Sequence, residues 1–141
     1  MRPKIMIAVL GTVAVIGGGT YAYLEYNRGT ADADAMRPVA SVTATELLTA
    51  FTSDEAAADD RFVGTAEQAI EVKGTIRAME PVGSDKTNVI LETGDPMAGV
   101  VCEFSNADLP GDWRSGASVT VKGICTGLLM DVVLVRCAAS Q

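Results

Sequence analysis

Five short segments in the second half of the chain alternate between apolar and polar residues, and this period of two constrains the fold more than any other feature. Such alternation is typical of a β-strand with one buried and one solvated face. In the last segment the period places Cys137 on the same face as Val133 and Val135. Breaks rich in Gly, Pro, Asp and Asn separate the segments. The predicted strands cover residues 70–77, 88–92, 100–104, 119–125 and 132–137.

The order of the segments predicts a mainly β fold, the five-stranded Greek-key barrel of the OB-fold. Three strands come first, a longer link begins at Asn106, and two further strands follow. In that barrel the first and fourth strands are neighbours. Each has an interior glycine, Gly74 and Gly123, which allows a long strand to coil around a small barrel. A small antiparallel sandwich, or an open sheet covered by a helix, is the alternative.

A helix is predicted immediately before the strands. Thr43 and Glu46 have the spacing of a capping box, which marks a helix N-terminus. Leu47 and Phe51 then begin an apolar stripe that continues on one helix face through about Asp60. We expect this amphipathic helix to bury its stripe against the barrel, so the folded OB domain is predicted to cover residues 43–141.

The N-terminal region, residues 1–24, is predicted to be a signal anchor. Residues 5–24 contain no charge and, as a helix, match the thickness of a bilayer core. Arg2 and Lys4 precede this run, so the positive-inside rule predicts a single pass through the cytoplasmic (inner) membrane, with the domain in the periplasm or cell exterior. A cleaved signal peptide is the alternative, and either kind of segment would export the domain. Residues 25–42 lack apolar periodicity and are predicted to be a flexible linker.

Charge is distributed unevenly along the chain. The whole sequence carries a net charge of −7, but the part after Arg28 holds eight bases and seventeen acids, a balance of −9. Affinity for nucleic acid comes largely from cationic groups that release condensed counterions. An acidic domain with few aromatic residues to stack on bases therefore disfavours nucleic-acid binding.

The chain contains no histidine, which removes the commonest general base and the commonest metal ligand. We therefore expect no catalytic residues, no metal site and no cofactor. In an exported protein the three cysteines can meet an oxidising environment. Cys102 and Cys137 lie late in two strands that run side by side in an OB barrel, so they are the candidate disulfide pair. Three buried free thiols, acting as small apolar side chains, are the alternative.

An apolar loop before the last strand supplies the candidate contact residues. Loops rarely carry consecutive apolar side chains, and in the OB-fold this loop borders the usual ligand face. The alternative is that these side chains cap the open end of the barrel. Two basic residues on the solvated face of the first strand extend the candidate set. The predicted contacts with a ligand or partner are Leu128, Leu129, Met130, Met97, Lys73 and Arg77.

Several stretches of the sequence resemble the tRNA_anti-like OB-fold family of bacterial proteins, over about residues 43–138. Members of this family are often lipoprotein-like or membrane-anchored proteins of unknown function, so the resemblance implies the fold and assigns no site residue. This chain lacks the cysteine that would carry a lipid. The stretches that carry the resemblance are residues 46–48, 54–59, 72–76, 101–104, 119–127 and 131–137.

These observations together predict a membrane-anchored, exported and non-catalytic OB-fold module. Its expected partner is an envelope protein or a small ligand. Binding of single-stranded nucleic acid is the first alternative. A hydrolase built on Ser84, Asp85 and Lys86 is a further alternative, but these residues lie in a predicted turn and fit turn chemistry better.

Overall fold

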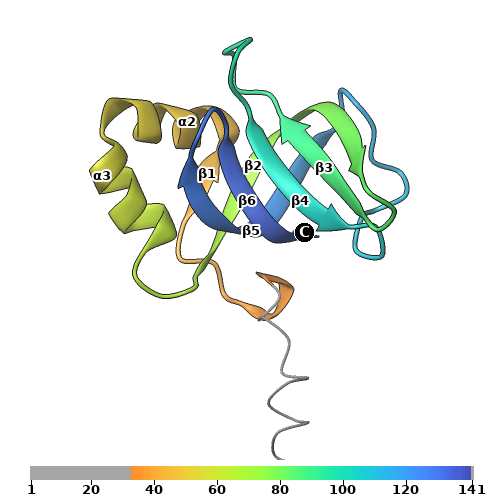
Figure 1. The fold of residues 1–141 in the computed structure, drawn as a ribbon, viewed down its shortest axis with the longest axis horizontal. Helices are drawn as coiled ribbons and strands as arrows, with labels where there is room; N and C mark the ends of the chain where they lie inside the picture. The colour runs from red at the N-terminus through yellow and green to blue at the C-terminus, as the bar shows by residue number, and fades with distance from the viewer. Residues whose placement is uncertain (1–32, 141) are drawn as a thin grey trace, which may run out of the picture. The chain divides into compact units, whose positions relative to one another are not determined.

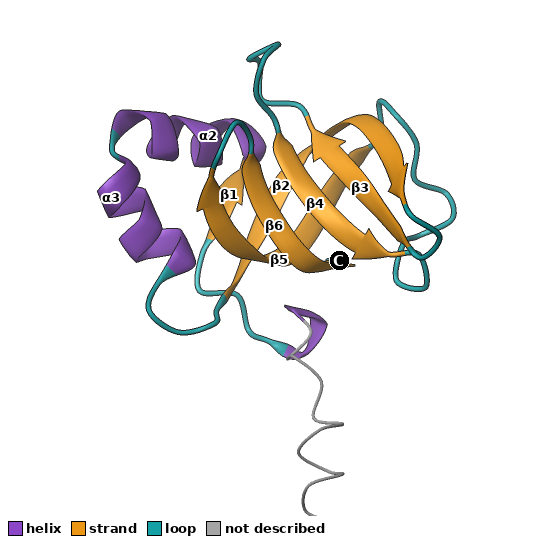
Figure 2. Cartoon of the chain, viewed as in Figure 1, coloured by secondary structure: helices purple, strands orange, loops and turns teal. Residues whose placement is uncertain are grey.

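Five strands close into a small barrel in the structure, a computed structural model that describes residues 33–140 (Figures 1 and 2). The N-terminal half of β2 pairs with β5, and its C-terminal half pairs with β3. Antiparallel β3 and β4 then lead to β6, which runs parallel to β4 and antiparallel to β5. This closed order is that of the predicted OB-fold barrel. The strands are β2 (Ala69–Val82), β3 (Lys86–Leu91), β4 (Val100–Ser105), β5 (Ser118–Leu128) and β6 (Val132–Ala139).

The inward side chains of the five strands form one continuous core. The predicted alternation is confirmed in β3 and β4, where Val89, Leu91, Val100 and Cys102 are fully buried. It is also confirmed in the first half of β2. Alternate side chains of neighbouring strands thus fill the barrel and leave the other set facing outward.

The predicted phase of the last strand is wrong before residue 137. Val132 and Leu134 are buried together with Cys137, whereas Val133 and Val135 are only partly buried. The cause is Arg136, which has a φ of 51°, a left-handed conformation that few non-glycine residues adopt. This local irregularity shifts the alternation by one residue and returns Cys137 to the core.

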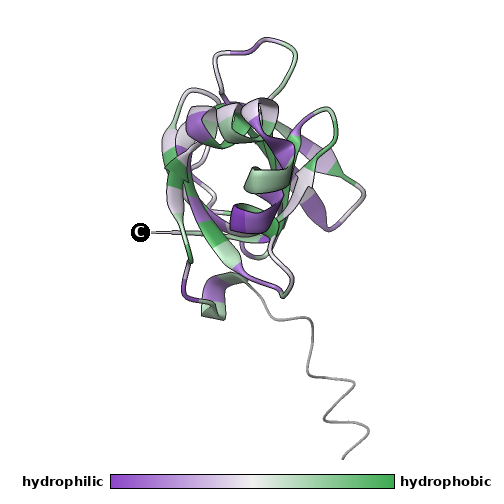
Figure 3. Cartoon of the chain, turned by 90° about the vertical axis from the view of Figure 1, so that its left-hand side faces the viewer, coloured by the Kyte–Doolittle hydropathy of each residue, from purple (hydrophilic) through white to green (hydrophobic). Residues whose placement is uncertain are grey.

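Two short helices and a further turn cover one end of the barrel. They are α2 (Ala44–Ser53), α3 (Glu55–Ala58) and η2 (Asp59–Val63). Figure 3 looks at the barrel from this end and shows helical segments along the edge of its opening. The buried side chains that these elements direct into the core are Leu47, Leu48, Phe51, Ala58 and Phe62.

The predicted capping box of α2 is confirmed: Thr43 Oγ accepts from the Glu46 backbone N–H, and Glu46 accepts from the Thr43 N–H. The helix does not continue unbroken to residue 60 as predicted. It ends at Asp54, whose extended backbone starts α3 and whose carboxylate accepts from the Ala57 N–H at 3.1 Å. A side chain that bonds the backbone in this way favours a new helix start over a helix interior.

The segment predicted as a flexible linker is ordered from residue 33 onward. Strand β1 (Ser41–Thr43) pairs in parallel with β2, and the 3₁₀ turn η1 (Ala33–Ala35) packs on the outside of the barrel. There Ala33 covers Ile124, an outward residue of β5 that is buried for this reason. The compact unit that contains the barrel begins at Asp32, earlier than the predicted boundary at residue 43.

The predicted anchor, residues 5–24, and the first part of the predicted linker lie outside the described residues. Between residues 33 and 140, no helix has the length and apolar character needed to cross a bilayer.

Candidate binding surface

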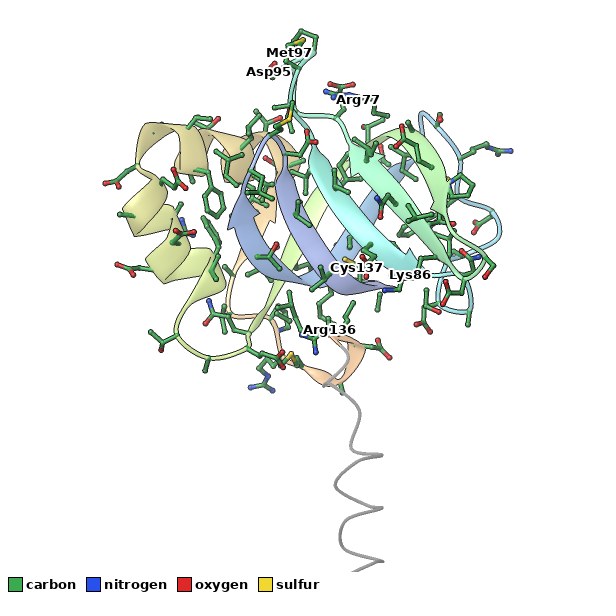
Figure 4. All side chains as sticks on the ribbon, viewed as in Figure 1. Arg77, Lys86, Asp95, Met97, Arg136 and Cys137 are labelled. Atoms are coloured by element: carbon green, nitrogen blue, oxygen red, sulfur yellow. The ribbon has the colours of Figure 1, made fainter. Side chains whose placement is uncertain are left out.

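The loop between β3 and β4, residues 92–99, is held in one conformation by hydrogen bonds. Arg77, which projects from β2, pairs with the Glu92 carboxylate and donates to the Asp95 carbonyl oxygen at 2.7 Å. Thr93 Oγ donates to the Ala98 carbonyl at 2.6 Å, and Asp95 accepts from the Met97 N–H at 2.8 Å. Figure 4 shows Met97 and Asp95 at the tip of this loop and Arg77 near its base. The loop is therefore a preorganised structure.

The short turn between β5 and β6 is joined to this loop. Asp131 accepts from the Gly99 N–H at 2.7 Å, and the Val132 N–H donates to the Gly99 carbonyl at 3.1 Å. Within the turn, the Leu129 N–H donates to the Asp131 carbonyl. The two loops therefore form a single unit at one edge of the barrel.

Three apolar side chains project from this unit into solvent. Met97 is 81% exposed, Leu129 88% and Met130 79%, the highest values among the exposed large apolar residues of the described chain. We call these three residues the apolar rim. Leu128, the fourth apolar candidate, is partly buried and packs against the core. The structure therefore joins the loop that carries Met97 to the β5–β6 turn through Gly99, and it packs Leu128 against the core.

An apolar row on the outer face of the barrel continues from the rim, and the sequence analysis missed it. Ile90 of β3 is opposite Val101 of β4, which is opposite Val133 of β6. All three are partly buried, because they face outward between buried neighbours. The sequence signal for this row was a β-branched residue at an outward position in each of three strands. Only the strand register shows that these three residues are adjacent.

The two basic candidates occupy different places and have different roles. Arg77 is engaged in holding the β3–β4 loop, so it supports the rim rather than presenting a free charge. Lys73 is exposed and lines an open groove of about 850 Å³ over β2 and β5, with Trp113, Ser118 and Thr120 also in its lining. The groove reaches the β3–β4 loop at Glu92 and Gly94, but its lining includes none of the three residues of the apolar rim.

Carboxylates dominate the surroundings of the rim. Glu92, Asp131 and Asp95 all act on Arg77, and the hydrogen bond with Glu92 is the largest of the effects that raise the pKa of Arg77. The same hydrogen bond lowers the pKa of Glu92 from an ordinary value of 4.5 to about 2. Neither residues 92–99 nor residues 129–131 include a base. Three carboxylates against one guanidinium leave this edge of the barrel negative.

The aromatic rings between residues 33 and 140 pack in the core or against it. Phe51 and Phe62 pack on each other with ring centroids 6.0 Å apart. Phe104 is buried, and Trp113 packs edge-on against it at 5.4 Å. Single-strand-binding OB-folds use exposed rings as stacking platforms within a basic groove. Neither a row of free rings nor a basic groove is present on the described surface.

The three cysteines are buried free thiols in the structure. Burial is the largest cause that raises the pKa of the Cys137 thiol, and its interaction with the Cys102 thiol raises that pKa further. Burial raises the pKa of Cys125 to about 11. Both members of the candidate pair face the core, and the parallel β4–β6 pairing stops at Cys102 opposite Leu134, three residues before Cys137. In the part of the chain that the structure describes, no cluster of three acidic or thiol side chains could hold a metal ion.

The closed barrel and its two joined loops are those of an OB-fold domain of the binding type. The family model described as tRNA_anti-like matches residues 1–139, and the chain therefore belongs to the tRNA_anti-like family. This confirms the resemblance seen in the sequence.

Two solved structures are similar. One is a lipoprotein from Klebsiella pneumoniae subsp. pneumoniae MGH 78578 for which nucleic-acid binding has been suggested. It is 14% identical, with a TM-score of 0.55 over 77% of this chain and 94% of that one. The other comes from the crystal structure of yeast Stn1 and Ten1, with 11% identity and a TM-score of 0.45 over 81% of this chain and 65% of that one. No curated protein matches the sequence.

Proposed function

We propose that this protein is a non-catalytic binding module, held at the cytoplasmic membrane by residues 5–24, whose barrel lies outside the cytoplasm and contacts an envelope protein or a small ligand. The observation that carries the proposal is the apolar rim. Three large apolar side chains stand in solvent on two loops that are hydrogen-bonded to each other.

The rim has the physical features of a binding surface. Exposed apolar side chains gathered in one place favour burial against a partner. Because the Arg77 network already orders the β3–β4 loop, little conformational entropy remains to be lost there on binding. Methionine side chains also adapt well to irregular apolar surfaces.

The proposed membrane anchor rests on the sequence. An uncharged run of twenty residues with two bases before it is typical of a retained single-pass helix. The similar structure from Klebsiella pneumoniae is described as a lipoprotein, and a covalently bound lipid also attaches a protein to a membrane, which supports a membrane location for this chain.

Single-stranded nucleic acid is the second candidate ligand, because nucleic-acid binding has been suggested for that lipoprotein. Lys73 and Trp113 in the open groove are the residues that would serve it. Against it stand the acid excess of the domain and the packing of Trp113 on Phe104. An electrophoretic shift of a labelled oligothymidine at low salt, lost in Lys73→Ala, would favour this candidate over ours.

Site-specific photocrosslinking in cells tests the proposed function. A photoreactive residue replaces Leu129 in the full chain, and the matched control replaces Val82, an exposed apolar residue of β2 that lies outside the rim. We expect position 129 to give a defined protein adduct on gels, or a defined small-molecule adduct by intact mass, and position 82 to give neither. Equal labelling from both positions, or none from position 129, would overturn the proposal.

A further inference from the structure

We propose that the apolar rim binds a protein segment that combines apolar side chains with lysine or arginine. This inference rests on the proposed function and adds the chemistry of the partner. The apolar part of the segment would cover Met97, Leu129 and Met130. Its basic part would face the carboxylates beside them.

Charge complementarity carries the inference. Arg77 is surrounded by Glu92, Asp95 and Asp131, and the ion pair with Glu92 neutralises its charge. Asp95 and Asp131 hold backbone N–H groups of the two loops, so their carboxylates are fixed beside the rim. An apolar surface bordered by fixed negative charge favours a partner with the opposite charge, and it disfavours acidic segments.

The apolar row on the outer face of the barrel makes the proposed binding surface elongated. Ile90, Val101 and Val133 extend the apolar surface from the loops across β3, β4 and β6. A segment that lies along this face would bury the row and the rim together. Anchoring by several apolar side chains at spaced positions is typical of a helix or strand that docks as one element.

The same charges argue against two other occupants. Nucleic acid and anionic lipid headgroups are both repelled by carboxylates. In addition, η1, where the described chain begins, lies on the opposite side of the barrel from the tip of the β3–β4 loop in both views (Figures 1 and 3). The described part of the chain therefore begins on the side of the barrel away from the tip of that loop.

Two matched peptides test the charge preference. Both are fluorescein-labelled helices of about 14 residues, or four turns, with the same leucine positions. One has lysine and the other glutamate at every remaining position. Binding to the full chain in non-ionic detergent is followed by fluorescence anisotropy, and protein-free detergent gives the background. We expect the lysine peptide to bind at least about tenfold more tightly, with the difference reduced in about 1 M NaCl.

Variants show whether the rim is the site. Met97→Ser, Leu129→Ser and Met130→Ser together should weaken binding of the lysine peptide about tenfold. The matched control, Val39→Ser with Val82→Ser, changes exposed apolar residues elsewhere and should bind as the parent does. Asp95→Asn keeps the acceptor for the Met97 N–H and should weaken binding about two- to fivefold. Circular dichroism melting of each variant confirms that it is folded.

Three results would overturn the inference: equal binding of the two peptides, unchanged binding by the rim variant, or rim-dependent binding to phosphatidylglycerol vesicles. The first and third leave the proposed function intact if photocrosslinks from position 129 persist, because the rim then binds a partner of different chemistry. Loss of those crosslinks would remove the proposed function as well.

Discussion

Gly123 leaves the space that the sulfur of Cys137 occupies. A Cβ atom at position 123 would lie 2.6 Å from Cys137 Sγ and 3.1 Å from the Leu134 side chain. Real contacts are not this short, so β5 and β6 would have to move apart. From the sequence, the expected role of Gly123 is to let a long strand coil around the small barrel. In the structure the close approach of Cys137 gives a further reason why this position is a glycine.

Gly123→Ala is therefore expected to lower the free energy of unfolding by about 1–3 kcal/mol, the usual cost of overpacking a core. Gly111→Ala is the control, because a Cβ there meets nothing within 4 Å, and it should change stability by less than about 0.5 kcal/mol. Urea unfolding gives both values. Adding Cys137→Ala should restore part of the loss, and its failure to do so would show that the sulfur is not the obstacle.

Cys102 and Cys137 are expected to form a disulfide when the chain is exported into an oxidising compartment. Both thiols are buried in the same core, and the bond would join β4 and β6 close to where their pairing ends. Peptide mapping without reduction, after alkylation in denaturant, should find this pair linked and Cys125 alkylated. Alkylation of all three cysteines would instead support buried thiols.

An ion pair between Arg77 of β2 and Glu92, the first residue of the β3–β4 loop, is one of the contacts that hold this loop. Because Arg77 lowers the pKa of Glu92 to about 2, the pair stabilises the folded chain above pH 4.5, the ordinary value for the carboxyl. This contribution is lost as the pH falls from 4.5 through 2, when Glu92 takes up a proton in the folded state. Both side chains are partly exposed, so salt should weaken the effect.

Glu92→Gln is expected to increase hydrogen exchange of the loop amides at pH 6, because Arg77 loses its charged partner. Mass-spectrometric exchange of residues 92–99 measures this. As the pH falls toward 2 the parent should approach the variant, once the rates are corrected for intrinsic exchange. A constant difference across this range would mean that the ion pair does not hold the loop.

The strands were predictable from the sequence because their alternation has a period of two, and the capping box of α2 was predictable because it is local. Three other features of the structure could not be predicted from the sequence. The phase of β6 depends on Arg136 at positive φ, which its residue type does not indicate. The order of residues 33–43 depends on parallel pairing with a distant strand. Met97, Leu129 and Met130 were predicted contact residues, but the joining of their two loops depends on the hydrogen bond between Gly99 and Asp131, thirty-two positions apart.

The described domain is an acidic barrel with exposed apolar side chains at one edge and aromatic rings packed in or against its core. The family and the fold indicate a binding domain. The described surface lacks the basic groove and free rings that single strands require, which is why a protein partner accounts better for the exposed rim. The candidate residues divide accordingly. Met97, Leu129 and Met130 form the proposed surface, Arg77 supports it, and Lys73 lines the open groove over β2 and β5.

The most direct test of this account is the yield of the photocrosslink from position 97 in full-length chains with and without Leu129→Asp. The Leu129 side chain is 88% exposed, so a carboxylate there costs the fold little, but it places a charge within the apolar rim. We predict that the variant keeps its melting temperature and loses most of the crosslink. An unchanged yield from a folded variant would contradict the claim that the rim is the binding surface.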